Sequence, residues 1–124
     1  MNEHINNNDI NTPISFFREK VRKFVEERNW EKYHTPKNLV QAINCEAGEL
    51  SSLLLFRKYS RDDVLSNKEL FENVSDEIAD VFIYLLSLIN TLNLDLTQSF
   101  IKKMEINKNK YSIKEFNDGM YYKK

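Results

Sequence analysis

One stretch of sequence decides the fold, residues 71–92, which read FENVSDEIADVFIYLLSLINTL. Apolar side chains recur in it every three or four residues, which is the period of an α-helix. One face is lined by Phe71, Val74, Ile78, Val81, Leu85, Leu88 and Leu92. The second half is apolar nearly all round, which is typical of a helix at the centre of a bundle or in a subunit interface. The spacing of Ser66 and Glu69 predicts a capping box at its start.

Three further helices are expected around this one. Thr-Pro pairs at residues 12–13 and 35–36 each join a capping residue to a proline suited to the first helical position. They predict helices over residues 12–28 and 35–56. Asp95, followed by Gln98, predicts a fourth helix that runs to Lys110, and the charged segment between residues 57 and 65 is expected to be a loop.

Composition favours one all-α domain. The 124 residues include only 2 Gly and 2 Pro, too few turn-forming residues for a many-stranded protein, so a four-helix, bundle-like fold is expected. Residues 1–11 are polar and Asn-rich and are expected to be a flexible leader. The domain is expected to span residues 12–111. Residues 112–124 are expected to form a C-terminal tail, in which Asp118-Gly119 predicts a turn.

Net charge and hydropathy limit the classes of partner that we expect for the chain. The net charge of −1 gives no argument for nucleic-acid binding. The longest apolar run, Val81 to Leu86, is too short to span a membrane, and the first residues lack the apolar core of a signal peptide. The single Cys45 cannot form an internal disulfide, and we expect it to be a small buried side chain. A cytoplasmic protein is therefore expected.

Two acidic motifs carry the chemistry: Glu46-Ala-Gly-Glu49 and Glu77-Ile-Ala-Asp80. In each motif the acids are three residues apart and leave the same helix face. Glu46 lies on the apolar stripe of its helix, and the second pair is interleaved with apolar residues. Carboxylates in such places are costly without a counter-charge, and no Lys or Arg stands three or four residues from Glu46, Glu77 or Asp80.

If the two helices that carry these motifs pack antiparallel, up to four carboxylates converge and would recruit a cation. Oxygen ligands suit Mg²⁺, Mn²⁺ or Ca²⁺ better than Zn²⁺. Two alternatives stand beside this one. The acids could be surface charge on a non-catalytic helical interaction module. A di-iron bundle would need Glu-x-x-His motifs, which the two histidines, His4 and His34, do not supply.

Taken together, these motifs resemble the MazG-type all-α nucleoside triphosphate pyrophosphohydrolases, and most closely their dCTP pyrophosphatase subgroup. The resemblance runs from residue 16 to residue 111. Beyond the acids, the matching stretches are FVEERNW (24–30), HTPKNL (34–39), DVFIY (80–84) and KMEINKNKY (103–111). It implies hydrolysis of the α–β phosphoanhydride, which gives a nucleoside monophosphate and pyrophosphate.

The resemblance also implies the site residues. Glu46, Glu49, Glu77 and Asp80 match the metal-binding acids, for Mg²⁺ with Mn²⁺ as a substitute. Glu46 or Glu49 would activate the attacking water. The phosphate-binding positions on the last helix are matched by Lys103, Asn107 and Lys110. A homodimer or a homotetramer is implied, with active sites near subunit contacts.

Three aromatic residues, Trp30, Phe56 and Tyr84, match positions around the base pocket of the resembling proteins. Stacking on a base is the expected role of these rings. The chain departs from the pattern at two places: Val21 stands where dCTP-preferring relatives carry His, and Phe56 replaces a Trp. The expected substrate is therefore dCTP or a modified dCTP, with dUTP or another pyrimidine triphosphate left open. His34 lies in a matching loop with either a structural or a functional role.

Overall fold

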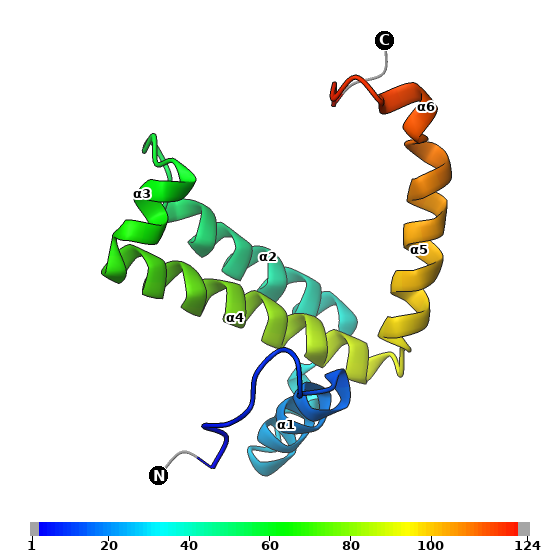
Figure 1. Ribbon diagram of the computed structural model, residues 1–124. Coiled ribbons are helices and arrows are strands. Elements are labelled where there is room, and N and C mark those ends of the chain that lie inside the picture. The colour runs from blue at the N-terminus through cyan, green and yellow to red at the C-terminus, as the bar shows by residue number, and fades with distance from the viewer. Residues whose placement is uncertain (1–2, 122–124) are drawn as a thin grey trace. The chain divides into compact units, whose positions relative to one another are not determined.

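The computed structural model describes residues 3–121, and every regular element within them is helical (Figure 1). The elements are α1 (Ile14–Glu27), the 3₁₀ turn η1 (Glu31–Tyr33), α2 (Pro36–Ser52), α3 (Arg61–Ser66), α4 (Lys68–Thr91), α5 (Leu96–Lys110) and α6 (Ile113–Phe116). The all-α fold class is thereby confirmed. No single helix in the described part of the chain is both long enough and apolar enough to cross a bilayer, and only α4 and α5 taken together meet both conditions.

The chain forms two compact units. The first, Met1–Leu92, holds α1 to α4 and the acidic motifs, and the second, Asn93–Lys124, holds α5 and α6. Asn93 itself adopts a left-handed backbone conformation with φ of 49°, which ends α4 as an Asn can do at low cost. The turn that was expected near Asp118-Gly119 is present in the second unit, where Gly119 has φ of 78°.

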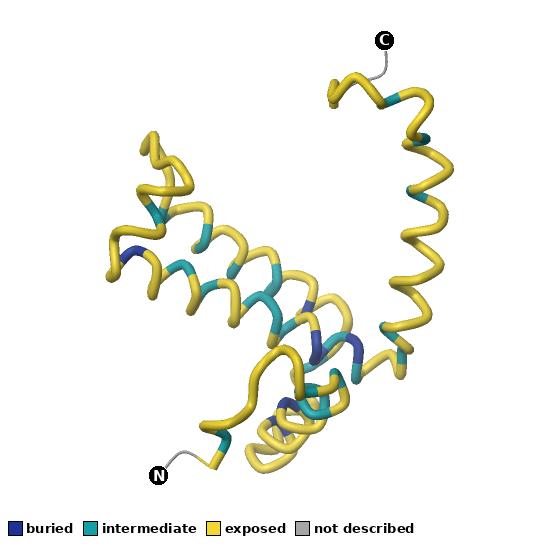
Figure 2. The backbone as a smooth tube through the Cα atoms, in the orientation of Figure 1, coloured by how far each residue is buried: buried dark blue, intermediate teal, exposed yellow. Residues whose placement is uncertain are grey.

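In the first unit, α2 and α4 lie side by side and antiparallel, and they form its most extensive helix contact (Figure 1). Helix α1 packs on the C-terminal half of α4. The hydrophobic core lies at that crossing, where Val21 and Val25 of α1 meet Leu86 of α4. Leu39 at the start of α2 is also almost fully buried. Buried residues therefore concentrate where α1, α2 and α4 approach one another (Figure 2).

Two predicted helix starts are confirmed by their hydrogen bonds. The Thr35 hydroxyl accepts from the amide of Asn38, with Pro36 as the first helical residue, and the Asp95 carboxylate accepts from the amide of Gln98. The expected cap at Thr12 is wrong. Pro13 is the residue that precedes α1, and it makes no side-chain cap. The Thr12 hydroxyl instead donates to Asn11 Oδ1 at 2.8 Å, within a turn formed by the asparagines that precede the helix.

The segment between α2 and α4 differs from the expected loop. Helix α2 ends at Ser52 rather than near Phe56, and the chain then turns. The short helix α3 begins with a capping box in which Ser60 and Asp63 bond to each other's backbone amides. The expected Ser66 capping box for α4 is wrong, because Asn67 caps that helix through the amide of Leu70. A six-residue charged helix has too little apolar periodicity to be recognised, so only its cap was available as a signal.

One residue and one segment differ from what the sequence predicted. Cys45 is exposed rather than buried, because its neighbour Glu46 faces α4 and successive helical residues point about 100° apart. The segment that was expected to be a leader makes contacts with α1. The His4 ring meets Phe16 edge to face with 5.0 Å between centroids, and Glu3 pairs with Lys20 at 3.4 Å.

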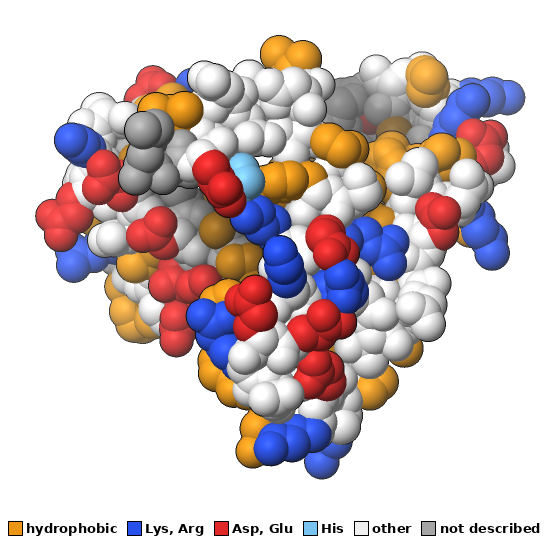
Figure 3. All heavy atoms as spheres, turned by 90° about the horizontal axis from the view of Figure 1, so that it is seen from below, with side chains coloured by type: hydrophobic (Ala, Val, Ile, Leu, Met, Phe, Trp, Pro, Cys, Tyr) orange, Lys and Arg blue, Asp and Glu red, His pale blue; other side chains and the backbone are white. Residues whose placement is uncertain are grey.

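Charged side chains of both signs are intermingled on the face shown in Figure 3. On the solvent side of α1, Arg22 forms ion pairs with Glu19 one turn before it and Glu26 one turn after it. The hydrogen bond from Arg22 holds the pKa of Glu19 below its usual range. The ion pairs are exposed, so they contribute little to the free energy of folding.

We expect Leu86→Ala to lower the free energy of unfolding by about 2–5 kcal/mol, because it leaves a cavity at the α1–α4 crossing. Leu86 is only 1% exposed, whereas Leu55, the matched control, is 57% exposed. Urea denaturation followed by circular dichroism measures both variants. Equal losses for the two would show that the core does not lie at this crossing.

Candidate active site

The acidic motifs lie opposite each other because α2 and α4 pack antiparallel. Glu46 and Glu49 are on α2, and Glu77 and Asp80 are on α4. Residues three apart in a helix lie on the same face. Both acids of each motif therefore lie on the face that is turned toward the other helix, or at the edge of that face. The convergence expected from the sequence is therefore present between these two helices.

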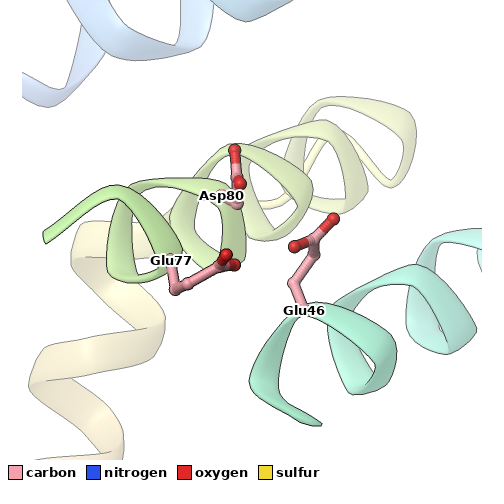
Figure 4. Close-up of side chains that lie close together, drawn as sticks. All are labelled: Glu46, Glu77 and Asp80. Carbon is pink, nitrogen blue, oxygen red and sulfur yellow. The ribbon is translucent and has the colours of Figure 1, made fainter. Parts of the chain in front are cut away.

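Three of the four acids form a tight cluster. Glu46, Glu77 and Asp80 each offer a carboxylate oxygen, and these oxygens all lie within 4.8 Å of one another. Figure 4 shows Glu46 projecting from α2 toward α4, where the carboxylate of Glu77 approaches it and Asp80 lies one turn further along. The two glutamates are half-buried and the aspartate is exposed, so the cluster opens to solvent on the side of Asp80.

Within residues 3–121, the charges that act on Glu46 and Glu77 all come from other acids. The Oε2 atoms of Glu46 and Glu77 are shielded from solvent and have no hydrogen-bond partner in the described part of the chain. Burial raises the pKa of Glu46, and the charges of Glu49, Asp80 and Glu77 raise it further. Burial likewise raises the pKa of Glu77, followed by the charges of Glu49 and Asp80.

These observations fit a divalent cation. A cation between α2 and α4 would satisfy both orphaned oxygens and offset the repulsion among the carboxylates. The donors are all carboxylate oxygens, which suits Mg²⁺ and Mn²⁺. Glu46, Glu77 and Asp80 are the residues that would hold it. Glu49 is exposed and is not one of these three, but its side chain lies beside both Glu46 and Glu77 and its charge raises the pKa of each.

A cavity of about 540 Å³ lies between α1 and α4, and its walls are mostly apolar. Trp30 and Tyr84, two of the three residues expected to bind a base, line it together with Val21. Tyr84 stands one helical turn after Asp80 on α4, so the cavity begins next to the acidic cluster. Phe56 is not brought to this cavity. It lies in the turn after α2 with φ of 58° and is 97% exposed.

The sequence did not single out several residues of this cavity. Phe24 meets Trp30 edge to face at 5.8 Å, and the guanidinium of Arg28 lies 3.6 Å from the centroid of the Phe24 ring. Arg28 also donates to the Phe24 carbonyl at 3.0 Å, so it holds this aromatic corner in place. His34 and Ser87 line the same cavity. The sequence left the role of His34 open, whereas Ser87 gave only a weak signal because it is a single polar residue in an apolar run.

The residues expected to bind phosphate, Lys103, Asn107 and Lys110, belong to the second unit. Their spacing of four and three residues puts them on one face of α5. Both lysines are exposed, Asn107 is half-buried, and the ammonium of Lys110 lies 5.2 Å from the centroid of the Tyr111 ring. The arrangement leaves the lysine side chains available to an anion, and their role stays a prediction.

No protein-family model matches the chain. It is 34% identical over 93 residues to dCTP pyrophosphatase 1 of Mus musculus, which covers 73% of this chain and 54% of the mouse protein. Against dCTP pyrophosphatase 1 of Homo sapiens the identity is 34% over 91 residues, with 72% and 53% covered. The chain thus spans about half the length of these curated relatives. A crystal structure of a pyrophosphatase from Archaeoglobus fulgidus matches with a TM-score of 0.73 and 34% identity, over 80% of this chain and 92% of that one.

The raised pKa values of Glu46 and Glu77 predict how the stability of the metal-free protein depends on pH. In the unfolded chain these groups titrate at about 4.3, and in the folded protein they titrate higher. Their contribution to stability is therefore complete below that pH and is lost as the pH rises through the folded pKa values. Urea midpoints measured with EDTA from pH 4 upward should fall more steeply for the wild type than for Glu46→Gln/Glu77→Gln. Parallel profiles would contradict the crowding of these acids.

Proposed function

Because this chain belongs to the MazG-like, dCTP pyrophosphatase-like proteins, we propose that it hydrolyses a deoxynucleoside triphosphate to the monophosphate and pyrophosphate. The observation that carries the proposal is the pairing of two features on one helix. The unneutralised carboxylates of Glu77 and Asp80 lie beside an apolar cavity that contains Tyr84. Such a site suits a ligand with a metal-binding polyphosphate at one end and a flat ring at the other.

Glu46, Glu77 and Asp80 would hold Mg²⁺, with Mn²⁺ as a substitute. When bound, the cation would neutralise the charge that develops on the phosphate oxygens. Glu49 is the better candidate for orienting the attacking water and accepting its proton, because it is exposed and lies beside Glu46 and Glu77 without being one of the three clustered ligands. Glu46, with one oxygen already shielded between the helices, serves better as a ligand.

Trp30 and Tyr84 would contact the faces of the base in the cavity. Phe56 is exposed and outside this cavity, so a base-binding role for Phe56 requires a second copy of the chain. Lys103 and Lys110, with Asn107, would contact the phosphates. We propose dCTP or a modified dCTP as the substrate, in line with the names of the curated relatives, and dUTP or another pyrimidine triphosphate as the alternative. Removal of unwanted nucleotides from the cytoplasmic pool would be the biological role.

We also propose that the protein works as a homodimer or a homotetramer. Four apolar residues spaced seven apart, namely Phe71, Ile78 and Leu85 of α4 and its C-cap Leu92, are 38% to 53% exposed. A stripe of this regularity is what a second helix covers in a helical interface. Buried against another copy, it would remove from water the apolar surface that a single chain leaves exposed.

A non-catalytic helical module remains the competing function. The two differ in their response to ligand: an enzyme of this kind is stabilised by Mg²⁺ together with a non-hydrolysable dCTP analogue, because ligands that bind only the folded state raise the melting temperature. A surface-charge role for the acids predicts no such shift.

We expect Asp80→Asn to lower kcat/KM for pyrophosphate release by about a hundredfold or more, equivalent to about 2.7 kcal/mol of transition-state stabilisation. Asp76→Asn is the matched control, since Asp76 is an exposed acid on the same helix outside the cluster. A coupled phosphate assay with added inorganic pyrophosphatase measures both. Full activity of Asp80→Asn, with circular dichroism unchanged, would remove the acidic cluster from the mechanism.

The oligomer has its own test. Ile78→Glu should lower the mass in solution, because it puts a charge in the exposed stripe, whereas Lys68→Glu adds the same side chain at the start of α4 and should not. Size-exclusion chromatography with light scattering gives both masses. A wild-type protein that is monomeric at micromolar concentration would rule out the proposed assembly.

A further inference from the structure

A second, polar stripe runs along α4. It consists of Glu77, Asp80, Tyr84, Ser87 and Thr91, at alternating intervals of three and four residues. This spacing keeps all five on one face of the helix. Its first two members belong to the acidic cluster, and Tyr84 and Ser87 line the apolar cavity. The stripe therefore connects the proposed phosphate end of the site to the interior of the cavity.

Ser87 is the feature of this stripe that the proposed function leaves unexplained. It is 4% exposed and is the one buried polar residue of the described chain. Two other helical serines, Ser52 and Ser75, satisfy their hydroxyls on the carbonyl one turn back, at 2.9 Å and 2.8 Å. Within residues 3–121 the Ser87 hydroxyl makes no hydrogen bond of that kind, and it lines the cavity instead. The Ser87 hydroxyl is not one of the shielded, unpaired atoms of residues 3–121, so it is open to the cavity and is free to bond a polar group of a ligand there.

His34 lines the same cavity as Ser87. It ends η1 and lines both this cavity and a smaller one of about 300 Å³ that shares Ser87. Its carbonyl accepts a long hydrogen bond of 3.5 Å from the hydroxyl of Thr91, which ties η1 to the polar stripe. Burial lowers the pKa of His34, although the charge of Glu31 acts in the opposite direction. The lowered pKa favours the neutral imidazole. A neutral imidazole offers one donor and one acceptor, and so does a hydroxyl.

We infer that Ser87 and His34 are specificity-determining residues that contact the hydrogen-bonding edge of a pyrimidine base, while Trp30 and Tyr84 contact its faces. The inference rests on the proposed function. Ser87 lies seven residues beyond Asp80, which is about 10 Å along the helix, so phosphates at the acidic cluster leave the base directed toward it. The pyrimidine edge presents neighbouring donor and acceptor groups, and an otherwise apolar wall penalises any of them that is left unpaired.

The test compares dCTP with dUTP, which differ only at this edge. The wild type should have different kcat/KM values for the two substrates. Ser87→Ala and His34→Phe should each move the ratio of kcat/KM for dCTP to kcat/KM for dUTP toward one by about tenfold. His34→Gln, which keeps a donor and an acceptor, should retain most of the discrimination. Glu26→Gln is the matched control, because Glu26 lines only the smaller cavity and should leave the ratio unchanged.

Pyrophosphate release is measured for each variant, and melting temperatures verify folding. Ser87→Ala removes one oxygen from a buried position, so it keeps the test valid should His34→Phe fail to fold. A wild type that cleaves no triphosphate overturns the proposed function and this inference with it. An active wild type that does not discriminate, or variants that both keep the wild-type ratio, would overturn this inference alone.

Discussion

The structure depends on an electrostatic repulsion among carboxylates that the described residues do not neutralise. Glu46 and Glu77 face each other between α2 and α4, and Asp80 lies beside them. Each glutamate has one oxygen that is shielded from water and that finds no hydrogen-bond partner among residues 3–121. Folding brings these groups together because apolar contacts hold the two helices side by side. The cost appears as raised pKa values for both glutamates. Such a cluster does not stabilise the fold by itself, and it is well suited to binding a cation that also binds a polyphosphate.

Helix α4 organises the rest of the molecule because its faces differ in chemistry. One face packs on α2 and α1 and includes Leu86 in the core. A second face exposes apolar side chains such as Ile78 at regular intervals. The polar stripe from Glu77 to Thr91 lies between them and carries both the acids and the residues of the cavity. Metal binding, base binding and assembly are thus proposed for one helix, and a change in its position would affect all three.

Much of this was predictable from local patterns. The period of α4 and the caps at Thr35 and Asp95 were sufficient to place three helices. The acidic cluster was predictable because carboxylates on apolar stripes without nearby cations demand an explanation. The resemblance to a known family then placed Trp30 and Tyr84, which do share a cavity.

What could not be predicted depends on tertiary contacts or on short elements. Helix α3 is too short for a helical period to be recognised in its sequence. Thr12 is a typical capping residue, but its hydroxyl donates to the neighbouring Asn11 instead of capping α1. The exposure of Cys45 follows from how α2 is rotated against α4. Ser87 is a single polar residue in an apolar run, and only the cavity that it lines shows its significance.

The most direct measurement is a crystal structure with Mn²⁺ and a non-hydrolysable dCTP analogue, in which anomalous scattering locates the metal. The account predicts an anomalous peak bounded by carboxylates from both α2 and α4, with the base of the analogue against Tyr84. A peak elsewhere, or carboxylates that stay unliganded while the analogue is bound, would contradict it.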